Sequence, residues 1–359
     1  MSTIRSARHG PANGRVCGAP ASWADARRFL AAIVTVGCIL SGMGCDRQGD
    51  VPVVYCSADE EFARQVFAEF TRQTGIKAEV LFDTEAGKTT GLVRRIEAER
   101  DAPRADVFWS SEVFNTVRLA EQGVLEPYRP KTAEDVDKRF RSPDDRWTGF
   151  GLRGRVVAFN TGKLTRSTAP KTWFELADAK WSGRLAMANP QFGTTRGHVA
   201  AMFAMWGQAK ATDFLGRLAK HGVRIADGNA AAVRMVARGE VDLCMTDTDD
   251  VWVAQRRGLP VDLVYPSMGE GSATLWIPNT VAILSGCRHP AAARRVADFL
   301  ASADVERLLA ESDSRNVPVR RALAGKLGIT QPTTTSVDYA ASAKVMPMAI
   351  EVAKKILLR

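Results

Sequence analysis

Apolar positions along residues 51–123 follow two alternating spacings. Short apolar runs at 51–56, 76–82 and 105–109 have the length and composition of buried strands. After the first run, Phe62, Val66, Phe67 and Phe70 recur at helical intervals, and Gly75 ends the pattern. Further helices are predicted over 88–100 and 112–122, the last stopping at Gly123. This order of strands and helices is typical of a parallel sheet covered on both faces.

A second alternation of the same kind follows. It predicts strands over 155–160, 184–188, 223–226 and 241–246, and helices over 198–209, 212–221, 230–238, 249–257 and 290–301. The last 60 or so residues have the pattern of helix and loop, and no repeat of fixed period occurs. The sequence therefore predicts an α/β protein of two lobes, each a mixed, mostly parallel sheet flanked by helices, with a cleft between them.

The first 45 residues have the pattern of an export signal. Five arginines precede an apolar run over 29–40, which is too short for an ordinary membrane-spanning helix, and small residues follow it at 41–44. Cys45 then resembles the acceptor cysteine of a bacterial lipoprotein, although Gly42 stands where a leucine is usual. We expect cleavage before Cys45 and a lipid anchor there. Plain cleavage without a lipid and a buried helix of the folded domain remain alternatives.

Charge and cysteine content narrow the function classes. The net charge of +9 falls to +5 beyond residue 44, because five arginines and one aspartate lie in the leader. No run of like charges remains, which argues against a nucleic-acid-binding protein. Cys56, Cys244 and Cys287 lack the spacing of a zinc site or a disulfide framework. We expect Cys56 and Cys244 to be small buried hydrophobic residues.

Candidate chemistry gathers in four strand-to-helix turns. Residues 56–59, 83–90, 110–112 and 246–250 are rich in small hydroxyl and acidic side chains. In parallel sheets such turns meet at one edge, where ligands bind. Helix capping is the alternative role for any single turn. The chain has none of the HExxH, GxSxG or GxGxxG motifs, and its four histidines are scattered. The sequence therefore favours a binding protein over an enzyme.

Four segments carry a resemblance to a known family. They are VVYCSADEEFARQVFAEFTRQTGIKAEV (53–80), ADVFWSSEVFNTVRLAEQGVLEPY (105–128), GLRGRVVAFNTGKL (151–164) and NAAAVRMVARGEVDL (229–243). In order and spacing they resemble the ferric-iron-binding family among the periplasmic solute-binding proteins of ABC importers. The resemblance covers roughly residues 52–320.

The resemblance implies a type II clamshell with a hinge. It assigns 51–152 plus 278–335 to lobe 1, 153–277 to lobe 2, and 336–359 to a C-terminal helical segment. It further implies a monomeric periplasmic protein that has no catalytic role and delivers its solute to a membrane permease with its ATPase. Fe(III) would then be the transported ligand rather than a cofactor.

The resemblance also indicates which residues face the solute. Asp249 and Asp250 occupy the family's paired-tyrosine positions, and the four tyrosines here are never adjacent, so a phenolate iron site is absent. Asp59 falls at a first-lobe histidine position, and Ser111 or Glu112 at a glutamate position. The turn 193–195 resembles the place where the family holds an anion. The full candidate set is Ser57, Asp59, Ser111, Glu112, Arg153, Gly193, Thr194, Thr195, Asn229, Asp247, Asp249 and Asp250.

Three interpretations of this set remain open. In the first, Asp59, Glu112, Asp249 and Asp250 hold a hard cation through oxygen ligands, with Asp247 beside them and an anion bound in addition. In the second, the acids accept hydrogen bonds from an organic anion such as a sugar phosphate or a phosphonate, which arginines (Arg153, Arg155, Arg196) and threonines also hold. In the third, Asp249 and Asp250 are merely helix-start acids. A metal-assisted hydrolase and a sensory binding module are the alternatives from other function classes.

Overall fold

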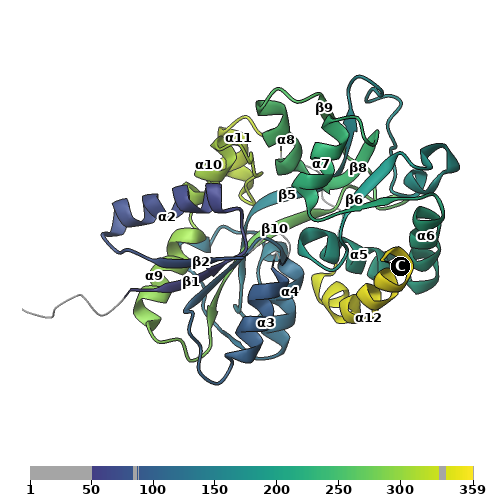
Figure 1. The fold of residues 1–359 in the computed structure, drawn as a ribbon. Helices are drawn as coiled ribbons and strands as arrows, with labels where there is room; N and C mark the ends of the chain where they lie inside the picture. Colours follow the sequence, from purple (N-terminus) through teal and green to yellow (C-terminus); the bar gives the residue numbers. More distant parts are fainter. Residues whose placement is uncertain (1–50, 84–86, 88, 331–336, 359) are drawn as a thin grey trace, which may run out of the picture. The chain divides into compact units, whose positions relative to one another are not determined.

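Two long antiparallel strands, β5 (Thr148–Asn160) and β10 (Trp276–Leu284), occupy the centre of the sheet (Figure 1). The computed structural model describes residues 51–83, 87, 89–330 and 337–358. The strand order is β2-β1-β3-β10-β5-β8-β6-β7, with β4 paired to β10 and β9 paired to β5. The remaining strands are β1 (Val53–Cys56), β2 (Glu79–Phe82), β3 (Val107–Ser110), β4 (Leu125–Glu126), β6 (Leu185–Ala188), β7 (Arg224–Ala226), β8 (Leu243–Asp247) and β9 (Val261–Val264).

The first half of the sheet follows the predicted alternation. Strands β1, β2 and β3 are parallel, and α2 (Glu60–Thr74), α3 (Thr90–Ala98) and α4 (Val113–Glu121) follow them in turn. Helix α2 buries Phe62, Val66 and Phe70 and ends at Gly75, whose φ of 71° is the left-handed conformation that glycine adopts most readily. Helices α9 (Pro290–Leu300), α10 (Ala303–Glu311) and α11 (Arg321–Lys326) come later in the chain.

The second half repeats the arrangement with β6, β7 and β8 parallel to one another. Its helices are α5 (Gly193–Trp206), α6 (Gln208–Lys220), α7 (Asn229–Ala237) and α8 (Thr248–Arg256). Cys244 on β8 is fully buried, as is Cys56 on β1, so both cysteines occupy the apolar positions expected of them. In both halves, the strands that precede a helix carry the turns where site residues were predicted.

The structure differs from the predicted elements in several places, one of which is the unpredicted two-residue strand β4. Strand β5 begins at Thr148 rather than at 155, because residues 148–154 pair with β10, a strand far away in the sequence. Helix α5 begins at Gly193 rather than at 198, since its first turn is glycine- and threonine-rich and lacks an apolar pattern. Strand β9 was not predicted and pairs with β5. In each case a partner far away in sequence stabilises the segment.

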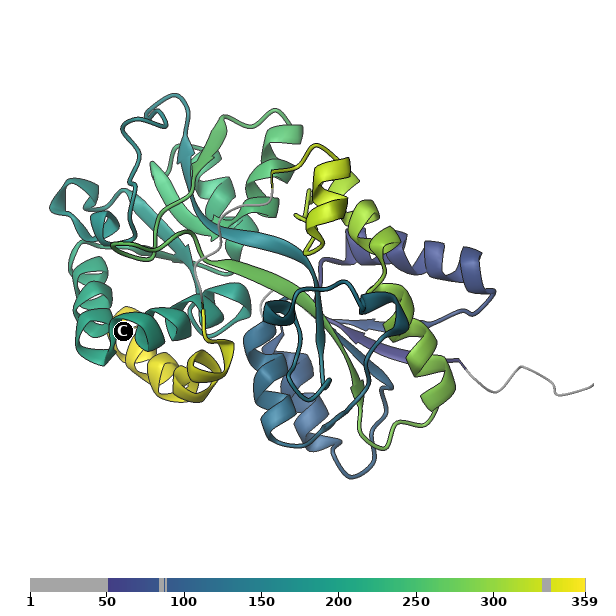
Figure 2. The ribbon, with the colours of Figure 1, turned by 180° about the vertical axis from the view of Figure 1, so that it is seen from behind.

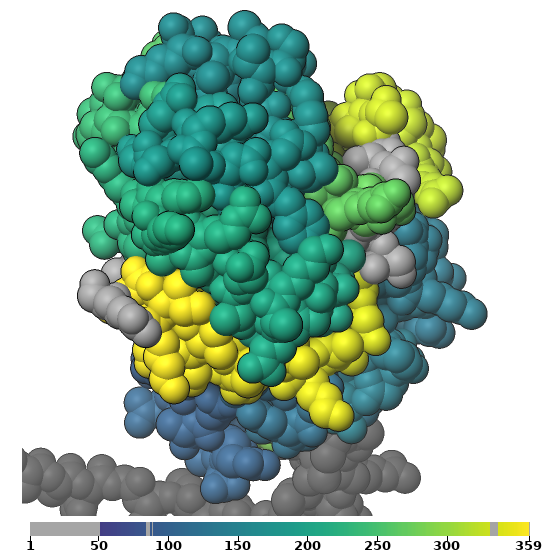
Figure 3. All heavy atoms as spheres, turned by 90° about the vertical axis from the view of Figure 1, so that its right-hand side faces the viewer, coloured from purple at the N-terminus to yellow at the C-terminus, as the bar shows by residue number. Residues whose placement is uncertain are grey.

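The last helix, α12 (Tyr339–Leu357), packs against α4, α5 and α6 (Figures 1 and 2). Figure 3 shows it in yellow between the teal and green helices and the blue ones. Its buried face includes Met346 and Ile350, which belong to the same apolar cluster as Phe114 of α4 and Val199 of α5. One continuous core therefore connects helices of both sheet halves through the C-terminal helix.

The predicted domain division stays a prediction. Its boundaries at 152/153 and 277/278 fall inside β5 and β10, where Arg153 pairs with Ile277 and Leu152 with Pro278. The export signal and Cys45 lie outside the described residues. Among the described residues, we find no helix with both the length and the apolar character needed to cross a bilayer.

Candidate functional site

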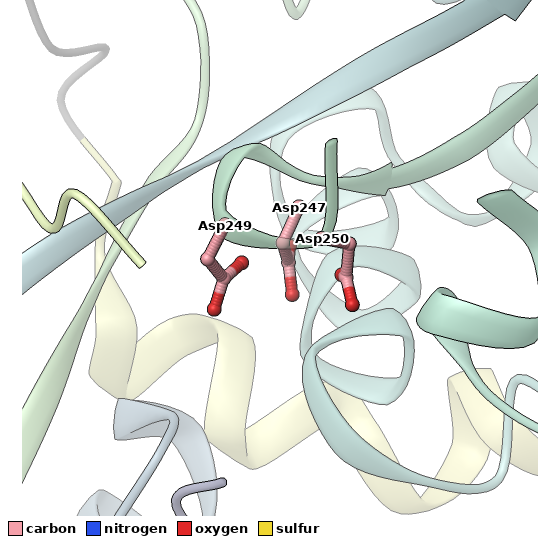
Figure 4. A group of neighbouring side chains, drawn as sticks. All are labelled: Asp247, Asp249 and Asp250. Carbon is pink, nitrogen blue, oxygen red and sulfur yellow. The ribbon is translucent and has the colours of Figure 1, made fainter. Parts of the chain in front are cut away.

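Three aspartates lie together where β8 ends and α8 begins (Figure 4). Asp247 is the last residue of β8, and Asp249 and Asp250 lie in the first turn of α8. One carboxylate oxygen from each can be chosen so that all three lie within 4.8 Å of one another. The close-up shows the three carboxylates pointing to the same side. Placement at a helix N-terminus favours their negative charge.

Asp247 is held in place by other side chains of the protein. It is 1% exposed, and Arg155 Nη1 donates to its Oδ1 at 2.8 Å. Its Oδ2 accepts hydrogen bonds from Thr194 Oγ1 and from Asn229 Nδ2, the latter at 2.9 Å. Both carboxylate oxygens are therefore engaged by neighbours, and Asp247 acts mainly as a scaffold between β5, α5 and α7.

Asp249 has a different environment from Asp247. Arg153 Nη1 donates to its Oδ2 at 3.1 Å, and the same guanidinium donates through Nη2 to the backbone oxygen of Ser111. The other oxygen of Asp249, Oδ1, is buried without a hydrogen-bond partner among the described residues, and so is Arg153 Nε. A buried unsatisfied carboxylate oxygen is costly. A bound solute or cation would supply the missing partner.

The pKa values of the two acids shift in opposite directions. Burial raises the pKa of Asp249 above its ordinary 3.8. The positive charge of Arg153 lowers this pKa, but the nearby carboxylates of Asp247 and Asp59 raise it further, and the net shift is upward. Burial also pushes the pKa of Asp247 upward, but Arg155, Arg153 and the Thr194 hydroxyl outweigh it and hold that pKa below 3.8. Asp247 is thus the acid that keeps its charge, and Asp249 the one that takes up a proton more readily.

A small cavity of about 30 Å³ lies beside these acids. It has room for an ion or one or two waters, since a water needs roughly 10–15 Å³ by this measure. The cavity is lined by Asp59, Arg153, Ala188, Asn189, Phe192, Gly193, Thr194, Thr195, Asp227, Gly228, Asn229, Asp247 and Asp250. We refer to it as the inner cavity. Eight of the twelve predicted ligand-binding residues line it: Asp59, Arg153, Gly193, Thr194, Thr195, Asn229, Asp247 and Asp250.

The four remaining predicted residues, Ser57, Ser111, Glu112 and Asp249, do not line the inner cavity. Ser111 and Asp249 line a smaller neighbouring cavity of about 20 Å³. Ser57 is buried and accepts a hydrogen bond from the Ser111 amide at 2.9 Å. Glu112 turns back onto its own helix, accepting hydrogen bonds from the amides of Phe114 and Asn115. Its observed contacts are those of a cap on α4, and burial raises its pKa.

The arginines proposed for an organic anion are also placed by the structure. Arg155 is fully buried, and besides Asp247 it donates through Nε to Nδ1 of His198 at 3.3 Å. Burial, reinforced by Arg155, lowers the pKa of His198 well below 6.5. Arg196 donates to the backbone oxygen of Gln191 and does not line the inner cavity. Arg153 is therefore the one arginine of the predicted set that faces it.

Sequence reasoning missed Asn189, Phe192, Asp227 and Gly228 as lining residues. Asn189 directly follows β6, while 227–228 directly follow β7, so they obey the strand-end rule applied to the other turns. Neither turn has the cluster of hydroxyl and acidic side chains by which the other four strand-to-helix turns were selected. The position after a parallel strand was the signal available in the sequence.

Comparisons with known proteins agree on the kind of protein. Residues 102–335 match the sequence profile of a family described as bacterial extracellular solute-binding protein. Iron uptake protein A1 of a Synechocystis strain is 26% identical over 342 residues, covering 87% of this chain and 93% of that protein. The major ferric iron-binding protein of Neisseria meningitidis is 28% identical over 263 residues, covering 71% of this chain and 77% of that protein.

Solved structures share the fold. Iron-bound HitA from Pseudomonas aeruginosa superposes with a TM-score of 0.72 at 24% identity, over 86% of this chain and 99% of that one. The periplasmic binding protein AfuA from Actinobacillus pleuropneumoniae, with fructose-6-phosphate bound, superposes with a TM-score of 0.72 at 21% identity. The superposition covers 87% of this chain and 99% of that one. The predicted two-lobed, mixed α/β fold of type II periplasmic binding proteins is thereby confirmed.

Proposed function

Because the chain belongs to the bacterial extracellular solute-binding protein family, we propose that it captures ferric iron for an ABC importer. Relatives named for iron uptake and ferric iron binding support this solute. The observation that carries the proposal is the inner cavity, which is the size of an ion and is bordered by Asp59, Asp247 and Asp250. Hard, highly charged cations prefer such oxygen ligands.

We assign the iron ligands to Asp59, Asp249 and Asp250. Asp249 lines two adjoining cavities rather than the inner one, but a carboxylate oxygen of it lies within 4.8 Å of one from Asp247 and one from Asp250. It would contribute Oδ1, which is buried and lacks a partner among the described residues. Asp247 orients the site rather than coordinating, since Arg155, Thr194 and Asn229 occupy its oxygens. An accompanying anion would lie at the start of α5, where Gly193, Thr194 and Thr195 line the same cavity. Glu112 is left out of this ligand set because it caps α4.

The same proposal implies which partners the protein has and where it acts. A monomeric, non-catalytic carrier would release its iron to a membrane permease driven by an ATPase. We propose that residues 1–45 direct export to the periplasm and that Cys45 carries the lipid anchor. Incorporation of labelled palmitate by the natural chain, and its loss in Cys45→Ser, is the measurement that checks the anchor.

Equilibrium titration of the purified protein with ferric iron tests the proposed function. We expect one iron per chain, and we expect Asp249→Ala combined with Asp250→Ala to abolish binding while circular dichroism stays unchanged. Asp213→Ala is the matched control, because Asp213 is an exposed aspartate on α6 away from the cavities. A folded double variant with unaltered affinity would reduce the two acids to helix-start residues.

One observation favours a second candidate, an organic anion such as a sugar phosphate or a phosphonate. Arg153 already neutralises part of the acidic cluster, at 3.1 Å from Asp249 and 3.9 Å from Asp247. A guanidinium in this position suits a phosphate or carboxylate. Titration with fructose 6-phosphate in place of iron decides between the two solutes, since binding of the sugar phosphate without iron binding would select the second.

The hydrolase and sensor alternatives have their own test. Deletion of the gene should abolish uptake of radioactive iron by whole cells if the protein is a carrier. A deletion strain that takes up iron normally but loses a transcriptional response to it would instead identify a sensory module. Turnover of a phosphate ester by the iron-loaded protein would identify a hydrolase.

A further inference from the structure

A cavity of about 720 Å³ lies outside the candidate site. It shares no lining residue with the inner cavity or with the smaller cavity beside that one. The residues that line it come from α8, from the segment that joins β9 to β10, and from the part of the chain around α10 and α11. Its volume falls within the roughly 300–1,000 Å³ that is typical of pockets for small organic ligands. We refer to it as the aromatic cavity.

Three aromatic side chains, Trp252, Tyr265 and Trp276, border the aromatic cavity. The rings of Tyr265 and Trp276 are stacked, with centroids 5.9 Å apart and planes inclined by 21°. Trp276 is 4% exposed and packs against Gly154, where an added Cβ atom would lie 3.1 Å from its Cη2. Tyr265 is 48% exposed, more than any other large apolar side chain in the described part of the chain. A planar ring lying against Tyr265 would extend this stack and cover exposed aromatic surface.

One acid and one base, Glu311 and Arg315, are the charged residues among the described lining of the aromatic cavity. Both side chains are exposed, and neither makes a hydrogen bond or ion pair with a described residue. Glu311 is the last residue of α10, where the helix dipole disfavours an acid. Arg315 has a φ of 44°, a left-handed conformation that is uncommon for residues other than glycine. Local structure therefore explains neither charge.

The segment that carries Arg315 is fixed on both sides. Asp313 pairs with Arg256 of α8 at 2.8 Å. Val317 and Leu152 of β5 exchange backbone hydrogen bonds of 2.9 and 2.6 Å in the two directions. Arg315 thus lies between two anchored positions while its guanidinium stays unpaired among the described residues. A cavity whose walls are held in this way needs little ordering when it binds a ligand.

We propose that the aromatic cavity binds a small zwitterion with an aromatic ring, that is, an aromatic amino acid. Its ring stacks on Tyr265, its carboxylate pairs with Arg315 and its ammonium group pairs with Glu311. One unpaired acid and one unpaired base select a zwitterion, because an anion would use Arg315 alone and a cation Glu311 alone. The inference goes beyond the proposed function and does not depend on it, since no residue of the inner cavity takes part.

Calorimetric titration of the iron-free protein with L-phenylalanine, L-tyrosine and L-tryptophan tests this inference. We expect at least one of them to bind at a single site. For phenylalanine, 3-phenylpropionate lacks the ammonium group and 2-phenylethylamine lacks the carboxylate; tryptophan has the matching analogues indole-3-propionate and tryptamine. Each analogue should bind at least about tenfold more weakly than its parent amino acid, and so should L-alanine, which lacks the ring.

Variants then place the ligand in the aromatic cavity. Arg315→Gln, Glu311→Gln and Tyr265→Ala should each weaken binding at least about tenfold. Arg307→Gln is the matched control and should stay within about twofold, since Arg307 lies on α10 but pairs with Asp304 and does not line the cavity.

Three results would overturn the inference. They are failure of all three aromatic amino acids to bind, equal binding of an analogue that lacks the ring or either charge, and unchanged affinity in the three cavity variants. Ferric titration is a separate measurement, so the proposed function stands or falls on its own.

Discussion

At the scale of single residues, neighbouring acids of one turn have different roles. Asp247 and Asp249 are two positions apart, yet Asp247 accepts hydrogen bonds from three side chains whereas one oxygen of Asp249 has no partner among the described residues. The difference arises because Arg155 of β5, Thr194 of α5 and Asn229 of α7 surround the carboxylate of Asp247, while only Arg153 contacts that of Asp249 by a side-chain hydrogen bond among the described residues.

Ferric binding should weaken as the pH falls, because the raised pKa of Asp249 places its protonation above the ordinary range of an aspartate. The folded apoprotein also binds this proton more readily than the unfolded chain. Its stability should therefore fall as the pH rises from about 3.8 through the raised pKa. Asp249→Asn removes this pH-dependent loss, so the melting temperature of the apo variant should fall less than that of the natural chain as the pH rises from about 3.8 to about 7. An equal fall in both proteins would contradict the assigned direction.

Asp247→Ala should destabilise the fold by about 3–5 kcal/mol, because it leaves the fully buried guanidinium of Arg155 without its carboxylate. Urea unfolding measures the change. Asp262→Ala serves as the control, since Asp262 pairs with the exposed Arg166 and its loss should cost only about 0–1 kcal/mol. Similar costs for the two substitutions would mean that burial does not distinguish these ion pairs.

At the scale of elements, the close approach of α4 and α5 connects the two sheet halves. A Cβ atom on Gly197 of α5 would lie 2.1 Å from Cδ2 of Phe114 on α4. The Phe114 ring has little freedom to move aside, because its edge packs against Tyr339 of α12 at 5.7 Å between ring centroids. Glycine at 197 is thus required by the packing of the two helices.

Gly197→Ala should destabilise the protein by about 1–3 kcal/mol and weaken solute binding, since it pushes α5 away from α4. Gly216→Ala in α6 is the matched control, because no atom lies within 4 Å of the added methyl group and the helix interior favours alanine by about 0.5–1 kcal/mol. Chemical denaturation and the ferric titration together measure both effects. A neutral Gly197→Ala variant would mean that the two helices separate without cost.

At the scale of the whole molecule, stability and solute binding are coupled. The acids proposed to hold the solute come from different parts of the sheet, with Asp59 before α2 and Asp249 and Asp250 at the start of α8. A solute between them adds contacts that the unfolded chain lacks. Its binding therefore stabilises the folded state by mass action.

Ferric iron at about 100 times its dissociation constant should add about 2.7 kcal/mol of stability and raise the melting temperature by several degrees. Differential scanning fluorimetry with and without ferric citrate is the measurement. The Asp249→Ala and Asp250→Ala double variant should show no shift. An equal shift in that variant would assign the stabilisation to iron bound elsewhere on the chain.

Much of the fold was determined by local pattern. The helical spacing of Phe62, Val66 and Phe70, and the glycine stop at Gly75, depend only on neighbours in the chain, so α2 was predicted nearly to its ends. The acids after β8 were likewise found from their place at the end of an apolar strand. Segments that depend on distant partners were shortened or missed, as with the first half of β5 and the first turn of α5.

The sequence by itself determined the α/β alternation and the turns that carry polar chemistry, because both depend on local spacing, and the class of protein followed from the resemblance of four segments to a known family. Only the tertiary structure decided what each polar residue does. Arg155 and Asp247 are 92 positions apart and meet across β5 and β8, while Glu112 turns onto its own helix rather than into the cavity. Burial and pairing decide which acids keep their charge, and those depend on contacts that no local pattern specifies.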